Sequence, residues 1–167
     1  YSLSAEAKQA KEKLAFLQEK GCDVTFTGDE EDVLKAWVKT VETRPGSPEA
    51  AQALMSLVRY HSRKIVDENT KKVIQAPDYV RCALYCDRLL DPRAYTGRGL
   101  APDAWRDLRS EALYLRGQCE LVSFAPQPRA KGEPEPKCIE DASLPRAVAF
   151  LRSAREAVDP KRQDLYK

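Results

Sequence analysis

Apolar side chains recur every three to four residues along most of this chain, which is the spacing of one face of an α-helix. The segment 33–53 is the clearest case. Its first apolar stripe consists of Val33, Trp37 and Val41. Pro45 and Gly46 then interrupt the pattern, and Ser47 and Pro48 have the residue types of an N-cap and a first helical position. A helix, a short proline turn and a second helix predict an antiparallel helical hairpin.

The same periodicity predicts about six helices, and therefore an all-α fold. The expected ranges are 5–20, 29–43, 48 to about 67, 77–90, 102 to about 124, and 143–158. A short extended piece is expected at 22–26, where apolar residues alternate. Residues 67–75 are polar, and this segment either extends the third helix or forms a loop.

Prolines divide the predicted helices into pairs. A proline follows a charged residue after three of the helices, at Pro45, Pro92 and Pro160, and proline cannot continue a helix. We therefore expect a single domain over 1–167 made of three hairpins, roughly 4–45, 47–92 and 101–160.

The segment 125–142 interrupts the third hairpin. It is rich in Pro, Lys and Glu, a composition that predicts a disordered or extended, solvated insertion that does not pack. Its part 127–137 has two interpretations: a tolerated surface loop, which is the commoner case, or a docking peptide that lies extended against a partner.

Composition narrows the functional classes. The 28 Lys and Arg nearly cancel the 26 Asp and Glu, so no long-range field gathers nucleic acid or anionic membrane. No apolar run approaches the ~20 residues that cross a bilayer. Five cysteines, an odd number, favour reduced thiols and thus the cytosol or an organelle matrix. The chain starts without Met, which is consistent with a removed presequence or with trimming.

At several positions the helices resemble those of tetratricopeptide-repeat proteins, in which a helix–turn–helix recurs every ~34 residues. Four of the predicted helices carry parts of that pattern. The matching positions are Val33, Trp37, Thr40 and Pro45; Tyr79, Ala83, Cys86 and Pro92; Ala112, Leu113, Tyr114 and Gly117; and Ala147, Leu151, Ala154 and Pro160. The resemblance implies a tetratricopeptide-like α-solenoid in which Gly117 permits close helix approach. The chain departs from the family in its long turns and in Met55, where the family often has glycine, so a generic solenoid or irregular bundle remains an alternative.

By this resemblance, the first helix of each hairpin lines the concave face of a superhelix and contacts a partner. The implied partner-binding residues are Glu49, Gln52, Ser56, Arg59, Tyr60, Glu111, Tyr114 and Gln118. Arg and Tyr suit this role because they bury a large area and still form hydrogen bonds. The alternative is that all eight are ordinary surface residues. Family members that grip acidic C-terminal peptides use Lys and Asn where Gln52 and Ser56 stand here, so that specificity is not implied.

Few residues are candidates for metal binding or catalysis. Cys82 and Cys86 share a helical face and, with His61 or Cys119, supply ligands of the types that zinc takes. No second pair at ligand spacing completes a tetrahedral set, and buried thiols that act as small apolar residues are the simpler interpretation. His61, the only histidine, falls on an apolar stripe, where we expect a packed ring with a satisfied nitrogen. We therefore predict no catalytic residue, metal or cofactor.

These observations favour a non-enzymatic interaction or scaffold module, such as an accessory subunit of a larger protein assembly. Its partners would be other proteins, with no small-molecule substrate. One alternative is an RNA-associated helical-repeat protein, which the near-neutral charge weakens. The other is a thiol redox protein that uses Cys82 and Cys86.

Overall fold

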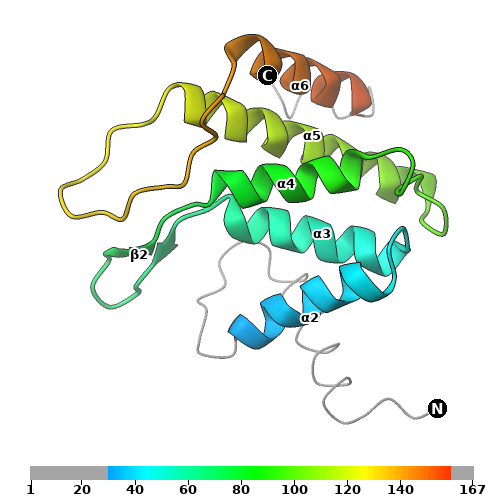
Figure 1. The fold of residues 1–167 in the computed structure, drawn as a ribbon, viewed down its shortest axis with the longest axis horizontal. Helices are drawn as coiled ribbons and strands as arrows, with labels where there is room; N and C mark the ends of the chain where they lie inside the picture. The colour runs from blue at the N-terminus through cyan, green and yellow to red at the C-terminus, as the bar shows by residue number, and fades with distance from the viewer. Residues whose placement is uncertain (1–29, 159–167) are drawn as a thin grey trace.

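The computed structural model describes residues 30–158, and most of them lie in five α-helices (Figure 1). The elements are α2 (Glu30–Thr43), α3 (Pro48–His61), β1 (Ile65–Val66), β2 (Val73–Gln75), α4 (Tyr79–Leu90), α5 (Pro102–Phe124) and α6 (Leu144–Ala157). The prediction of a mainly α-helical chain is confirmed, with a two-stranded sheet added. The expected helix at 5–20 and the extended piece at 22–26 lie outside the described residues. Within those residues, none of the helices has the length and apolar character needed to cross a bilayer.

Short polar side chains cap three of the helices. Ser47 precedes α3 and its Oγ accepts a hydrogen bond from the Ala50 amide at 3.1 Å. Asp78 precedes α4 and accepts from the Arg81 amide at 2.9 Å. Ser143 has the same position before α6. Each cap satisfies an amide that the first helical turn leaves without a backbone partner, which fixes where the helix begins.

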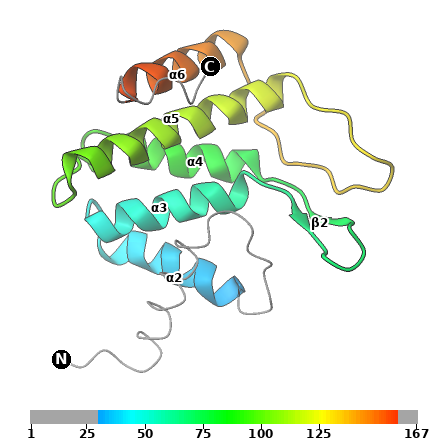
Figure 2. The same cartoon turned by 180° about the vertical axis from the view of Figure 1, so that it is seen from behind.

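Each described helix packs against the next one in the chain, from α2 to α6, so these helices form one continuous stack. Figure 2 shows α3 and α5 side by side on one face, with α2 and α4 behind them. The core lies between these layers and consists largely of side chains from α3 and α4, with Trp37 and Val41 of α2 at one edge. The helix α6 lies on the far side of α5, where Gly117 allows the close approach that the sequence implies. A Cβ at Gly117 would come within 2.8 Å of Leu151 Cγ.

The third helix ends earlier than the sequence predicts, at His61 rather than near 67. The Ser62 hydroxyl donates to the Arg59 carbonyl at 2.9 Å and closes the last turn. Ile65, Val66, Val73 and Ile74 follow, and their β-branched side chains favour strands over helix. Residues 67–75 therefore complete an antiparallel β-hairpin with a bulge, instead of a longer helix or an unstructured loop.

The fourth helix begins at Tyr79, two residues after the predicted start at Pro77. The intervening Asp78 has a non-helical backbone and serves as the N-cap. The amide of Tyr79 donates to the Lys137 carbonyl at 2.9 Å, and the Lys137 amide donates to the Pro77 carbonyl at 3.1 Å. Pairing with the distant insertion thus replaces the first helical turn that the sequence predicts.

Two segments project from one end of the stack, and the views in Figures 1 and 2 agree on this placement. We call residues 62–76, which contain the β-hairpin, the hairpin arm. Residues 125–138, the first part of the Pro-rich insertion, are the proline arm. Most of the proline arm is exposed, but 137–139 pairs with the start of α4 and packs Ile139 against the core. The expectation that the whole insertion is unable to pack is therefore wrong for these residues.

Candidate functional site

The predicted partner-binding residues come from two helices that the fold places next to each other. Arg59 of α3 and Glu111 of α5 form a bidentate ion pair, with Nε–Oε1 at 2.7 Å and Nη2–Oε2 at 2.5 Å. Both side chains are about one third exposed, at 40% and 35%. Two parallel hydrogen bonds fix the planar guanidinium and carboxylate in one geometry. The α3 and α5 members of the predicted set therefore belong to one continuous face.

The other members of the set differ in exposure. Glu49 and Gln52 are exposed on α3, and Ser56, which is half-buried, donates to the Gln52 carbonyl at 3.0 Å. On α5, the Gln118 amide donates to the exposed Tyr114 hydroxyl at 3.1 Å. These side chains present donors and acceptors to solvent along the face that Arg59 and Glu111 join. We call this set, without Tyr60, the α3–α5 face.

Tyr60 does not lie on this face. It is only 4% exposed, and its hydroxyl lies 3.4 Å from Gln75 Oε1 at the end of β2. Its ring meets His61 edge-on, with the ring centroids 5.0 Å apart. Burial against the β-hairpin, which the sequence did not predict, leaves Tyr60 little surface for the predicted partner contact.

The cysteines form a buried cluster between α4 and α5. Cys82, Cys86 and Cys119 are at most 1% exposed. Contact with Cys82, followed by burial, raises the pKa of the Cys119 thiol. Contact with Cys119 lowers the pKa of Cys82, but contact with Cys86 and burial outweigh this effect and raise it. Thiolates, the nucleophilic form, are therefore disfavoured here. No group of three metal-ligating side chains among residues 30–158 is arranged to hold an ion.

His61 packs as an apolar residue at the end of α3. It is 7% exposed and stacks on Tyr85 with the ring centroids 5.7 Å apart. Burial lowers the pKa of His61; nearby Asp78 opposes this shift, while Arg81 and Lys137 add to it. The ring is therefore neutral at pH 7. Its Nδ1 is buried and has no hydrogen-bond partner among the described residues.

A buried carboxylate that the sequence analysis did not single out joins α5 to α6. Glu120 is 0% exposed and accepts hydrogen bonds from Arg146 Nε at 2.7 Å, Arg116 Nη1 at 2.9 Å and the Ser143 amide at 3.0 Å. Burial alone would raise the pKa of Glu120. The hydrogen bonds from Arg146, Ser143 and Arg116 outweigh burial and hold this pKa below its ordinary value of 4.5.

Arg116 extends the same network to α4 and to the ring of an α6 phenylalanine. Its Nε donates to Asp87 Oδ1 at 2.9 Å, and its guanidinium carbon lies 4.7 Å from the Phe150 ring centroid. Every member of this network has a partner inside the fold. Its role is therefore structural: it fixes the relative positions of α4, α5 and α6.

A cavity of about 530 Å³ lies between the bases of the two arms. Its apolar wall includes Val73 of β2, Tyr79 of α4 and Val122 of α5. Five prolines complete the wall: Pro77, Pro126, Pro128, Pro134 and Pro136. The cavity thus combines residues from the hairpin arm, the proline arm and two helices, and it is the feature of this end that most resembles a ligand site.

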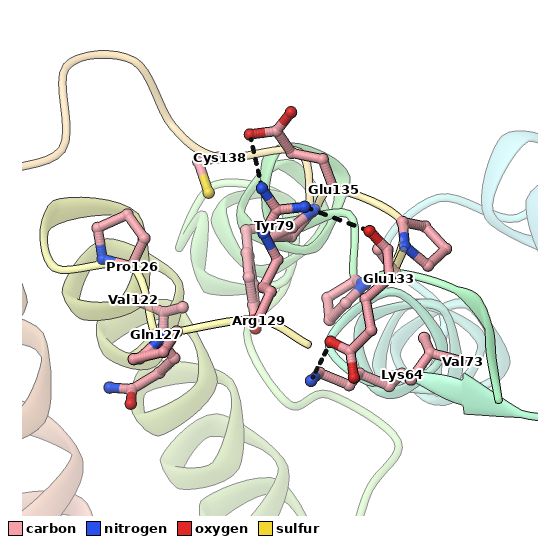
Figure 3. A pocket seen from close by; sticks show the side chains of 15 residues that line it. Lys64, Val73, Tyr79, Val122, Pro126, Gln127, Arg129, Glu133, Glu135 and Cys138 are labelled. Carbon is pink, nitrogen blue, oxygen red and sulfur yellow. Dashed lines mark hydrogen bonds and ion pairs between the residues drawn. The ribbon is translucent and has the colours of Figure 1, made fainter. Parts of the chain in front are cut away.

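Figure 3 shows two cations among the side chains that line this cavity. Lys64 Nζ of the hairpin arm lies 3.2 Å from Glu133 Oε2. Arg129 is held by two long contacts, each 3.4 Å, to the Glu133 carbonyl and to Glu135 Oε1. Cys138, the least buried of the four described cysteines, also contributes to the wall. Glu133 and Glu135 line the cavity as well, so it offers apolar surface together with two basic groups that are each paired with an acid.

In comparisons with known proteins, no family model, curated protein or solved structure matches the chain.

Proposed function

We propose that the chain is a non-enzymatic protein-interaction module, such as an accessory subunit, that binds its partner through the α3–α5 face. The observation that carries this proposal is the bidentate Arg59–Glu111 pair. The two residues are 52 positions apart in the sequence, and their pairing joins α3 and α5 into one surface. The polar groups of this surface are held in place before a partner binds. A surface organised before binding loses less conformational entropy when a partner docks on it.

The side chains around this pair suit protein contact. Tyr114 combines a large ring with a hydroxyl, and Gln118 and Gln52 present amides that both donate and accept. Arg59 and Glu111 neutralise each other in their ion pair, so the surface has little net charge. This balance favours a polar protein surface as partner over the phosphate backbone of RNA, which requires an excess of basic groups.

For the fold, we propose the tetratricopeptide-like arrangement that the sequence resembles. The placement of α3 and α5 in one layer, with α2 and α4 in the other, supports this proposal. The close contact of α5 with α6 at Gly117 supports it as well. The buried Cys82 and Cys86 thiols, with the Cys82 pKa raised, support packing rather than redox exchange as the role of these residues.

Affinity purification of the full chain from its native source, followed by mass spectrometry, tests the proposed function. The test variant combines Tyr114→Ala with Gln118→Ala on α5. The matched control combines Leu84→Ala with Arg88→Ala, which are exposed side chains at the same i, i+4 spacing on α4. We expect the wild type and the control to retain one set of partners at stoichiometric levels, and the α5 variant to lose them.

Two results would contradict the proposal. The first is a chain that elutes as a monomer without any partner from a native extract. The second is loss of the partners by the α4 control while the α5 variant retains them, which would move the interface to the opposite layer. Circular dichroism should show that both variants fold, since Tyr114, Leu84 and Arg88 are exposed and Gln118 is half-buried.

A further inference from the structure

We propose that the cavity between the two arms is a docking site for an extended acidic segment of a partner protein. One aromatic or aliphatic side chain of that segment enters beneath the proline arm, and a neighbouring carboxylate pairs with Arg129. This site is separate from the α3–α5 face and does not depend on it. The proposal stands on the cavity wall, on the loosely held arginine and on the charge of the hairpin arm.

Most of the cavity wall is apolar, and its polar members are Lys64, Gln127, Arg129, Glu133 and Glu135. Five prolines line the cavity, and the fixed φ of proline restricts how the backbone can collapse into it. Proline also has no amide hydrogen, so these residues add no backbone donors to the wall. Tyr79 adds an aromatic surface. A volume of about 530 Å³ exceeds that of any single side chain, so it accepts even an indole ring together with part of its backbone.

Arg129 supplies the specificity for a carboxylate. Its two contacts, to the Glu133 carbonyl and to Glu135, are both 3.4 Å long, at the outer limit of useful hydrogen bonds. The Glu135 side chain is 79% exposed, so water replaces Arg129 as its partner at little cost. A carboxylate brought by a bound segment forms a shorter, bidentate pair with this guanidinium than Glu135 does.

The hairpin arm adds positive charge beside the cavity. Lys71 and Lys72 are exposed at its turn. Two acids share this turn: Asp67 accepts hydrogen bonds from the Asn69 amide at 2.9 Å and the Thr70 amide at 2.6 Å, and Glu68 is exposed. The excess of positive charge comes from the arm as a whole, which adds Arg63 and Lys64 to the two lysines of the turn. The hairpin arm thus attracts acidic residues that flank the inserted side chain.

The surface beyond the cavity favours a polypeptide over a small molecule. Val66 and Ile74 of the hairpin arm are 43% and 61% exposed, and Ile74 is the residue that the bulge leaves without a strand partner. A ligand confined to the cavity would leave both side chains in water. An extended segment that continues along the hairpin arm covers them.

Nuclear magnetic resonance of the ¹⁵N-labelled full chain tests the proposal, with the peptide Asp-Glu-Trp-Glu-Asp, blocked at both ends, as the probe. We expect saturable shifts for the amides of Val73, Ala76, Tyr79 and Arg129. Two comparison peptides, one with Ala in place of Trp and one with Lys in place of every acid, should bind at least about fivefold more weakly, because each lacks one of the two recognised groups.

Arg129→Gln should weaken binding of the probe at least about fivefold, because it removes the partner of the peptide carboxylate. The matched control is Arg152→Gln, an exposed arginine on α6, on the other side of α5 from the hairpin arm. It should leave the affinity unchanged. As a second readout, in a Cys22→Ser background, saturating peptide should slow alkylation of Cys138, which lines the cavity. Unchanged spectra outside the arms show that both variants fold.

Several outcomes would overturn the proposal. They are no saturable shift at the cavity, equal binding of the Ala or Lys peptide, or equal loss of affinity in the two arginine variants. Equal binding of free indole would indicate a small-molecule site instead. The same shifts on raising the protein concentration alone would indicate a second copy of the chain as occupant. None of these results bears on the Tyr114 and Gln118 test of the α3–α5 face.

Discussion

The helical stack and the end that carries the two arms are held together in different ways. In the stack, the buried charged side chains are paired: Glu120 has three donors, and Arg116 has two acids and a ring. At the arms, the ion pairs are 3.2 and 3.4 Å long and partly exposed, and a cavity of about 530 Å³ separates the segments. The difference teaches that side chains are closely packed between the helices of the stack and loosely packed at the arms, where we propose that a partner docks.

Thiol reactivity gives the largest expected contrast between the two regions. In a Cys22→Ser background, Cys138 at the cavity should alkylate in the native state. Cys82, Cys86 and Cys119 should react at least about 1000-fold more slowly, because they must wait for the stack to open. Peptide mapping by mass spectrometry measures each rate. Labelling of Cys82 or Cys119 within about tenfold of Cys138 would show that the stack opens locally and is not fully packed.

Removal of the buried carboxylate should cost the stack more stability than any surface change. Glu120→Ala leaves Arg116 and Arg146 without their shared partner, and breaking a buried ion pair typically costs about 3–5 kcal/mol. Urea unfolding measures this change. Glu111→Ala, on the same helix, is the matched control and should cost less than about 1 kcal/mol, because its pair with Arg59 is partly exposed. Equal costs would remove the distinction between buried and surface pairs.

Acid should weaken the stack through the same carboxylate. The pKa of Glu120 in the folded chain lies below its ordinary value of 4.5, so the folded state binds this proton less tightly than the unfolded state. The stabilisation is complete above pH 4.5 and is lost as the pH falls through the lower folded-state pKa. Thermal melts of the wild type and Glu120→Gln should therefore converge on acidification. A difference in melting temperature that stays constant at every pH would show that Glu120 is not charged in the folded state.

Single glycine substitutions should show a smaller difference in stability between the stack and the arms. Gly117→Ala removes a helix-destabilising glycine, but the new Cβ would meet Leu151 at 2.8 Å, and overpacking typically costs about 1–3 kcal/mol. We expect a net loss of about 1–2 kcal/mol. Gly132→Ala in the proline arm meets nothing within 4 Å, so only its positive φ of 87° matters, and the loss should be about 1 kcal/mol from backbone strain alone. Stabilisation by Gly117→Ala would show that α6 moves freely away from α5.

The sequence predicts the stack far better than it predicts the arms. The bounds of α5 and the end of α2 at Thr43 agree with the apolar periodicity and the proline positions. Those signals are local, because each helix hydrogen-bonds within itself. The strands have two and three residues, which is too short for an alternating pattern to stand out. Two β-branched pairs, Ile65–Val66 and Val73–Ile74, are the signal that indicates them.

The site residues that the sequence analysis missed depend on distant contacts. Arg116 and Glu120 are four residues apart on a helix, which looks like an ordinary solvated ion pair until α6 covers them. Lys64 and Glu133 meet across 69 residues, so no local pattern places the proline arm against the hairpin arm. Tyr60 shows the converse case, because its helical position suggests exposure and the β-hairpin buries it.

Hydrogen exchange of the full chain, alone and in the assembly purified from its native source, tests the account most directly. In the free chain we expect the amides of α3, α4 and α5 to exchange slowly and those of 65–75 and 125–136 to exchange fast. In the assembly, exchange should slow along α5 near Glu111 to Gln118 and in the two arms. Arms as protected as the helices in the free chain, or added protection confined to the outer side of α4, would contradict the account.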